Sequence, residues 1–161
     1  MTDFLRDLLS HAEWANADFF HTWGKSPASD HEDLRRRMDH LIGVQHGFAQ
    51  LLRGEPPGGP KDGPPSTYGE LLAWAPRCHA QWNQLMGEVD EGALSRRIHI
   101  PWFGDPEFSV TARDAIVQVA MHSQHHRGQC MTRLRELGGE PKNVDWIIWL
   151  WKQKPAARWA V

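Results

Sequence analysis

Residues 122–129 read HSQHHRGQ and place three histidines within five positions. Upstream of them, Thr111 and the carboxylate three positions later form a capping-box pattern, which predicts the start of a helix. Downstream, Gly138 and Gly139 predict its end. We therefore expect one long helix to carry the whole stretch, with the rest of the chain packed around it.

The spacing of the three histidines distinguishes them. On a helix that advances about 100° per residue, His122 and His126 lie about 40° apart, one turn above the other, so both can reach a single metal ion. The apolar stripe of this helix runs close to His126, whereas His125 is expected to face outward. His122 and His126 are thus the inward pair. Because such a pair can also be two unrelated histidines, a metal site needs a third ligand.

Length, charge and cysteine content narrow the class of protein. A chain of 161 residues can bury the core of one domain without disulfides. We expect residues 1–154 to form that domain and 155–161 to form a flexible tail. The net charge of −2 offers no basic face for nucleic acid. Only Cys78 and Cys130 are present and they form no CxxC pair, so we expect no disulfide and a reducing compartment.

The N-terminal residues and the apolar runs bear on localisation. Acidic residues stand where a signal peptide would carry basic ones, and no apolar run approaches the roughly 20 residues of a membrane-spanning helix. We expect a cytoplasmic protein that has neither a membrane nor a nucleic acid as partner.

Helical periodicity recurs in four other segments, bounded by capping residues, glycines and prolines. The expected helices are 3–23, the segment from the Ser29–Glu32 capping box to Gly54, the segment from the Thr67–Glu70 capping box to Gly87 with a kink at Pro76, and 145–151. Residues 54–66 contain five prolines and four glycines, a linker long enough for a crossover connection. A hairpin is expected from 94–100 and 107–110 around the turn at 103–106.

The second of these helices has one face stripped of side chains. Gly43 and Gly47 lie roughly 60° and 20° from the direction of His40. Each interior glycine costs about 1 kcal/mol relative to alanine, so either close approach of another helix or open space for a ligand should offset that cost. His46 lies about 120° away from His40, and we expect it to be a surface or packing residue.

Four features of the chain resemble the DinB/YfiT-like family of bacterial metalloenzymes, and they cover nearly its whole length. They are EWAN at 13–16, His40 placed fourteen residues before Gly54, the hairpin before the long helix, and the 122–129 stretch with GGEP at 138–141. The most specific of them is HRGQ at 126–129.

The resemblance implies an all-α fold, a four-helix bundle of the DinB/YfiT type with a short hairpin before the last long helix and a short C-terminal helix. Members of the family are often dimeric. They hold a divalent ion with one histidine from the second helix and an HxxxH pair from the last long helix. Carried over to this sequence, the metal ligands are His40, His122 and His126, and no catalytic residue is assigned.

Such a site favours certain metals. Three neutral imidazoles leave coordination positions open, as in catalytic sites. All-nitrogen ligation favours zinc, nickel, copper or iron(II) over magnesium or calcium. We expect one divalent ion per chain, with zinc or nickel first and iron or copper as alternatives. Cys130, one turn beyond His126, is a conceivable fourth ligand, but its place in the apolar stripe favours an ordinary buried thiol.

Three functions fit these expectations. The first is a thiol S-transferase, an activity that some members of the family resemble. In it a low-molecular-weight thiol, bound to the metal as thiolate, attacks a small-molecule electrophile held over Gly43 and Gly47. The second is a metal-dependent hydrolase of small esters or amides. Ser123 stands where zincin peptidases carry a glutamate base, which disfavours a peptidase. The third is a non-catalytic metal-binding dimer module.

Four further expectations concern individual residues. Gln129 either orients substrate or a ligand imidazole, or is solvated. Arg127 is expected to pair with a carboxylate such as Asp39, or to reach solvent, in a structural role. The nine tryptophans should serve the core and an intersubunit face. Trp146, Trp149 and Trp151 should form an exposed patch, which together with the resemblance predicts a homodimer.

Overall fold

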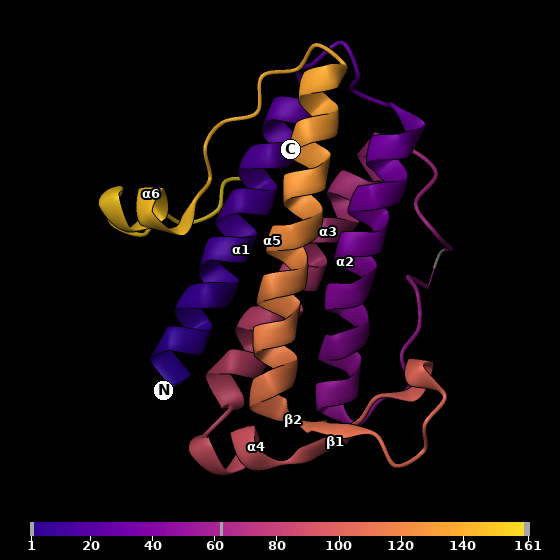
Figure 1. Ribbon diagram of the computed structural model, residues 1–161, viewed down its shortest axis with the longest axis vertical. Coiled ribbons are helices and arrows are strands. Elements are labelled where there is room, and N and C mark those ends of the chain that lie inside the picture. Colours follow the sequence, from indigo (N-terminus) through magenta and orange to yellow (C-terminus); the bar gives the residue numbers. More distant parts are fainter. Residues whose placement is uncertain (1, 62, 160–161) are drawn as a thin grey trace.

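Four long helices dominate the computed structural model, which describes residues 2–61 and 63–159. The elements are α1 (Thr2–Gly24), α2 (Glu32–Arg53), α3 (Tyr68–Glu88), α4 (Glu91–Ser95), β1 (Arg97–His99), the 3-10 turn η1 (Pro101–Phe103), β2 (Ser109–Thr111), α5 (Ala112–Glu136) and α6 (Trp146–Trp151). The four long helices α1, α2, α3 and α5 lie side by side, with α4 and the strands at one end and α6 beside α1 (Figure 1). The chain is therefore mostly helical with one small sheet, in agreement with the predicted class.

The linker between α2 and α3 is a crossover. The side chain of Arg53, at the end of α2, donates to Gln84 near the end of α3, and the backbone of Tyr68, at the start of α3, donates to Asp30 just before α2. These two helices consequently run in the same direction, and the linker returns along the side of α2 (Figure 1). Each long helix packs against two others, in the pairs α2 with α5, α1 with α5, α2 with α3 and α1 with α3.

The predicted helix starts are confirmed at α5 but not at α2. At α5, Thr111 Oγ1 accepts from the backbone N–H of Asp114 at 3.1 Å, and the Asp114 carboxylate accepts from the backbone of Thr111. At α2, the capping box of Ser29 with Glu32 is wrong, because Ser29 lies inside a turn. His31 is the N-cap instead, and its Nδ1 accepts from the backbone N–H of Asp33 at 3.3 Å.

Two hydrogen bonds to the carbonyl of Ala28 explain the later start of α2. The indole N–H of Trp23, which is buried, donates to the carbonyl of Ala28 at 2.7 Å, and the backbone N–H of His31 donates to the same carbonyl at 3.0 Å. The turn is therefore closed around Ala28, and the helix can begin only after His31.

The end of α2 follows the prediction, and the start of α3 follows it only in part. Gly54 closes α2 in the left-handed conformation, with φ of 76°. At α3, Thr67 Oγ1 accepts from the backbone N–H of Glu70 at 3.2 Å. The carboxylate of Glu70 bonds mainly to the backbone and hydroxyl of Ser66, and only weakly to the backbone of Thr67. The helix continues through Pro76 without interruption.

The hairpin is shorter than predicted. Strands β1 and β2 pair antiparallel, with Ile98 opposite Val110. The segment before them is helical, because Asp90 Oδ1 accepts from the backbone N–H of Ala93 at 2.7 Å and caps α4. The expected strand from Leu94 is therefore wrong over its first residues: Leu94 is a buried residue of α4.

A buried polar layer divides the apolar core in two. One apolar cluster lies toward the hairpin and contains Leu5, Phe48, Trp82 and Ile116, and the other contains Phe20, Trp23, Leu41 and Leu134. Between them, at the middle of the long helices, lie buried polar side chains. These are Asn16, Gln45, His79, Ser123 and Arg127.

Arg127 in this layer corrects an expectation. Its side chain is only 1% exposed. It donates to Asn16 Oδ1 at 3.0 Å and to Gln124 Oε1 at 2.5 Å. Pairing with Asp39 or exposure to solvent was therefore the wrong expectation, although the role is structural. Asn16 also donates to His79 Nε2 at 3.1 Å, so this one amide joins α1, α3 and α5.

The tryptophans of α6 do not form one exposed patch. Trp149 is 2% exposed and packs in a small third cluster with Trp14 and Val144, while Trp151 is 77% exposed beside the exposed Ile147. The expected exposure of Trp149 is wrong because α6 turns this side chain against α1. The homodimer stays a prediction.

The segment expected as a tail contacts the helices as far as Trp159. The carbonyl of Pro155 accepts from the indole of Trp149 at 3.0 Å, and the indole of Trp159 donates to Glu13 Oε1 at 3.2 Å. Residues 160 and 161 of this segment lie outside the described part of the chain. Among the described residues, no helix has the length and apolarity needed to cross a membrane.

Candidate metal centre

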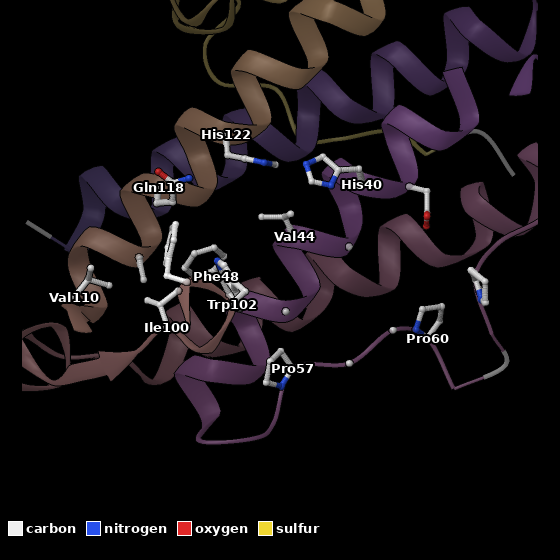
Figure 2. A pocket seen from close by; sticks show the side chains of 18 of the residues that line it. His40, Val44, Phe48, Pro57, Pro60, Ile100, Trp102, Val110, Gln118 and His122 are labelled. Atoms are coloured by element: carbon white, nitrogen blue, oxygen red, sulfur yellow. The ribbon is translucent and has the colours of Figure 1, made fainter. Parts of the chain in front are cut away.

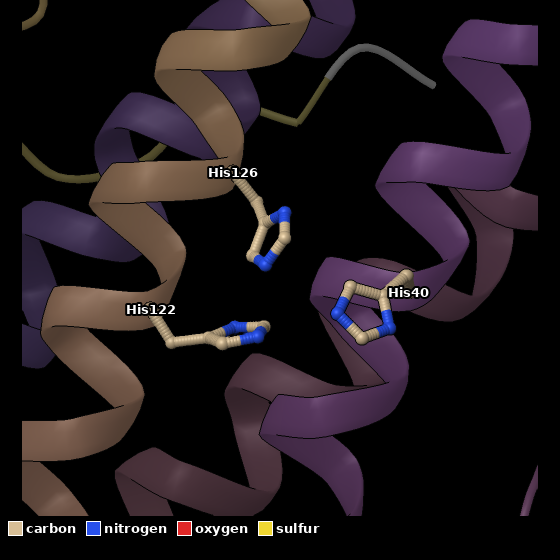
Figure 3. A group of neighbouring side chains, drawn as sticks. All are labelled: His40, His122 and His126. Carbon is tan, nitrogen blue, oxygen red and sulfur yellow. The ribbon is translucent and has the colours of Figure 1, made fainter.

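Three histidines converge where α2 packs against α5. His40 comes from α2, and His122 and His126 come from successive turns of α5 (Figure 3). Each offers a ring nitrogen, and these three atoms lie within 4.8 Å of one another. The ring centroids are 5.1, 4.7 and 4.2 Å apart for the pairs 40–122, 40–126 and 122–126. The three residues expected as metal ligands are therefore close enough to hold one ion.

The register of the two helices is set by a buried hydrogen bond next to this group. Gln45 of α2 donates from Nε2 to Ser123 Oγ of α5 at 2.8 Å, and Ser123 donates in turn to the carbonyl of Val119 at 2.6 Å. Because Ser123 follows His122 directly, this bond aligns α2 with α5 at the level of the histidines.

Burial and neighbouring charges keep two of these imidazoles, those of His122 and His126, neutral. Burial, together with the charges that His126 and His40 would carry, lowers the pKa of His122 to about 4. The pKa of His126 is lowered as well, first by burial and then by His40. Near pH 7 the rings of His122 and His126 therefore keep lone pairs available for a metal. The buried Nδ1 of His122 has no hydrogen-bond partner in the described part of the chain, which fits an ion as the missing partner.

Gln129 orients one of these rings. Its Oε1 lies 3.0 Å from Nδ1 of His126, and its Nε2 lies 3.0 Å from Nε2 of His125. The amide oxygen can only accept, so Nδ1 of His126 donates, which leaves Nε2 of that ring for the ion. Of the two alternatives considered for Gln129, the geometry favours the orientation of a ligand imidazole.

The other candidate ligands lie elsewhere. His125 is exposed on α5. His46 is buried, bonds through Nδ1 to Gln81 Oε1 at 2.9 Å and packs against Trp74, as expected for a packing residue. Cys130 is fully buried in the core, and burial raises the pKa of its thiol to about 12. An ordinary buried thiol is thus the better description of Cys130.

A cavity of about 920 Å³ adjoins the histidines. It lies between α2, the proline-rich linker, the hairpin and the first half of α5, and His40 and His122 reach its edge (Figure 2). Its lining includes Val44, Phe48, Pro57, Pro60, Trp74, Ile100, Trp102, Phe103, Phe108, Val110 and Gln118.

The cavity accounts for the two glycines of α2. A Cβ atom added at Gly43 would lie 3.8 Å from Trp74, and one at Gly47 would lie 3.8 Å from Pro57, which are ordinary contact distances. No neighbouring helix therefore requires glycine at these positions. Open space for a ligand is the remaining explanation of the two considered.

Sequence reasoning missed the aromatic side of the cavity. Trp102 and Phe103 belong to η1, and Phe108 follows in the same loop. The available signal was three large aromatic residues inside an otherwise polar turn, which is an unusual composition for a loop on the surface.

The comparison with known families agrees with this geometry. The family model described as the DinB superfamily matches residues 7–130, a region that contains His40, His122 and His126. No curated protein matches the chain.

Proposed function

This chain belongs to the DinB superfamily, and from that premise we propose that it is a metal-dependent thiol S-transferase that acts on a small electrophile. The observation that carries the proposal is the group formed by His40, His122 and His126 at the edge of a cavity large enough for a second molecule. We further propose that the long helices form the four-helix bundle layout of this family.

The donor set suits one divalent ion per chain, with zinc or nickel favoured over iron or copper. When bound, such an ion would supply the positive charge that keeps a small thiol deprotonated near neutral pH. The protein residues do the remaining work. The three imidazoles hold the ion, Gln129 fixes the ring of His126, and the cavity beside Gly43 and Gly47 places an electrophile next to the sulfur.

The transfer needs no further reagent. The thiol proton goes to solvent, and the sulfur forms a bond to the electrophilic carbon. The leaving group departs with the electron pair of the bond that breaks. No protein cysteine takes part, in keeping with the burial of both Cys78 and Cys130.

One observation favours metal-assisted hydrolysis as a second candidate. Asp39 lines the same cavity next to His40, and burial raises the pKa of its carboxyl. A carboxylate at this place is a candidate general base for a water molecule. The large cavity favours an enzyme, either the transferase or the hydrolase, over a non-catalytic module in which the ion only holds two helices together.

The first test is metal content. His40→Ala should lower metal occupancy severely, because it removes one of three ligands. The matched control, His125→Ala, removes an exposed histidine from the same stretch of α5 as His122 and His126 and should leave about one ion per chain. Elemental analysis of the purified proteins measures both. An empty site in His125→Ala, or a full one in His40→Ala, would contradict the proposed ligand set.

The second test separates transfer from hydrolysis. Titration of the cobalt(II)-loaded protein with small cellular thiols should add a sulfur-to-metal charge-transfer band. Conjugation of an electrophile should then be faster with the wild type than with His40→Ala. If no thiol adds the band, or if the two proteins conjugate at equal rates, the transferase is excluded and the hydrolase becomes the better candidate.

A further inference from the structure

The lining of the cavity beside the histidines is apolar along most of its surface. Aliphatic and aromatic side chains from α2, the linker and the hairpin face one another across it (Figure 2). The rings of Phe48 and Trp102 meet edge to face at 5.0 Å, and those of Phe103 and Phe108 do so at 5.1 Å. Two aromatic pairs thus belong to the wall of the cavity.

These aromatic rings are unusually exposed for their size. Trp102 is 48% exposed and Phe103 is 65% exposed. Full burial of such a side chain contributes roughly 1.5–3 kcal/mol relative to leaving it in water. An apolar molecule inside the cavity would cover these rings and so gain part of that free energy.

The linker is held in place as the opposite wall. The backbone N–H of Gly58 donates to Gln50 Oε1 of α2 at 2.8 Å, and Pro57 and Pro60 stand on either side of it in the lining. Proline has few accessible backbone conformations, which favours a fixed wall. The cavity is therefore formed before any ligand enters.

The charges on the lining exclude one class of ligand. Asp39 and Asp114 are the charged side chains among the described residues that line the cavity, and no lysine or arginine is among them. Away from the histidines, a carboxylate or phosphate on the ligand would find no cationic side chain as a partner. Its desolvation would go uncompensated.

The volume indicates the size of the ligand. Cavities of about 300–1,000 Å³ hold drug-sized molecules, and this one, at about 920 Å³, lies at the upper end of that range. It therefore has room for both a small thiol at the histidines and a second molecule with more than one ring.

From these observations we propose that the cavity binds an uncharged, apolar molecule with an aromatic body. The molecule is held between the glycine face of α2 and the aromatic residues Trp102, Phe103 and Phe108. The inference deepens the proposed function, on which it rests only for the identification of this molecule as the electrophile. Binding itself needs neither metal nor thiol.

The test uses two naphthalene fluorophores that differ in charge. The uncharged probe is N-phenyl-1-naphthylamine, and its anionic counterpart, 8-anilino-1-naphthalenesulfonate, carries one sulfonate. With metal-free wild-type protein, the uncharged probe should bind at least tenfold more tightly than the anionic one, measured by fluorescence titration. Equal affinities, or tighter binding of the anion, would overturn the proposal.

Two variants locate the bound probe. Gly47→Leu places a side chain into the cavity and should weaken binding of the uncharged probe at least tenfold, while Gly47→Ala should have a smaller effect. Phe103→Ala removes an exposed ring, so it should leave the fold intact and weaken binding severalfold. The matched control is Ile147→Ala, which truncates an exposed apolar side chain on α6 and should not change binding. If Phe103→Ala binds the probe as tightly as Ile147→Ala does, the cavity is not the binding site.

The outcomes also separate this inference from the proposed function. If the uncharged probe binds in the cavity but no thiol is conjugated, the transferase fails and the ligand class stands. If thiol is conjugated but the uncharged probe does not bind, the ligand class fails and the transferase stands.

Discussion

At the scale of single residues, the hydrogen bond from His126 to Gln129 is a solvent-exposed part of the metal centre. Partners of this kind fix the tautomer and the direction of a ligand ring, and their loss typically weakens metal binding by about 10–100-fold. We predict that Gln129→Ala weakens cobalt(II) binding by about tenfold. This is the lower end of that range, because water can replace the exposed acceptor. Competition with a chromophoric chelator measures the affinity.

Two further variants show whether the acceptor is what matters. Gln129→Glu keeps an oxygen for the Nδ1–H of His126 and should bind cobalt(II) at least as well as the wild type does. Thr132→Ala changes an exposed position on the same helix and should have no effect. Equal affinities for Gln129→Ala and Thr132→Ala would show that the ring of His126 is oriented by something else.

Sequence periodicity could predict only part of the metal centre. His122 and His126 lie on one helix, so a period of about 3.6 residues places them correctly, and it also places His125 outside. His40 lies on another helix, and the resemblance to a known family was needed to connect it with them. The partner of Arg127 could not be predicted, because Asn16 lies 111 residues away and nothing local marks the contact.

At the scale of whole elements, two glycines near helix ends differ in whether their backbone conformation requires glycine. Gly54 closes α2 with φ of 76°, whereas Gly87 lies inside α3, without a positive φ and with open space around it. A left-handed backbone costs an L-residue roughly 1–2 kcal/mol, while glycine within a helix costs up to about 1 kcal/mol relative to alanine. We predict that Gly54→Ala lowers the free energy of unfolding by about 1 kcal/mol and that Gly87→Ala raises it by a few tenths.

Urea denaturation of the two variants and the wild type measures these changes. Each variant adds one methyl group near the end of a helix, so each serves as the control for the other. Changes of the same sign would mean that the helix ends are not held as described.

The same scale shows where local sequence patterns failed. The capping pattern at Thr111 was sufficient, because both of its reciprocal bonds form. At Ser29 the same pattern was overridden by the bond from the indole of Trp23 to the carbonyl of Ala28. The aromatic side of the cavity was missed because the three aromatic residues of the loop mark an unusual surface but not what it lines, which depends on how α2 and α5 pack.

At the scale of the whole molecule, the buried polar layer connects the helices. Asn16 joins Arg127 and His79, and Gln45 joins Ser123. Buried polar groups stay buried only when their partners are in place, so such a layer favours one register of the helices over others. Two motifs that carry the family resemblance, EWAN at 13–16 and HRGQ at 126–129, thereby contribute to this packing, and HRGQ contributes to the metal centre as well.

His79 in this layer makes the stability of the protein depend on pH. It is buried, accepts from Asn16 at Nε2 and packs against Trp159. Burial, and then the positive charge of Arg127, lower its pKa from 6.5 to about 3. Between these two values the unfolded chain binds a proton at His79 that the folded chain does not. The stabilisation is therefore complete above about pH 6.5 and is lost progressively as the pH falls toward 3.

We predict that His79→Gln, which keeps an acceptor for Asn16, is less stable than the wild type at pH 7.5 but that the difference shrinks at lower pH. For one proton the shrinkage between pH 7.5 and pH 5 is about 2 kcal/mol. Urea denaturation at several pH values measures this change in the stability difference. Both proteins are used metal-free, so that metal binding does not contribute to either curve. Trp159→Phe is the control, because it loosens the packing around His79 without removing the titrating group, and its difference from the wild type should stay constant. Parallel curves for His79→Gln and the wild type would mean that His79 takes up its proton in the folded protein, with the polar layer open to water.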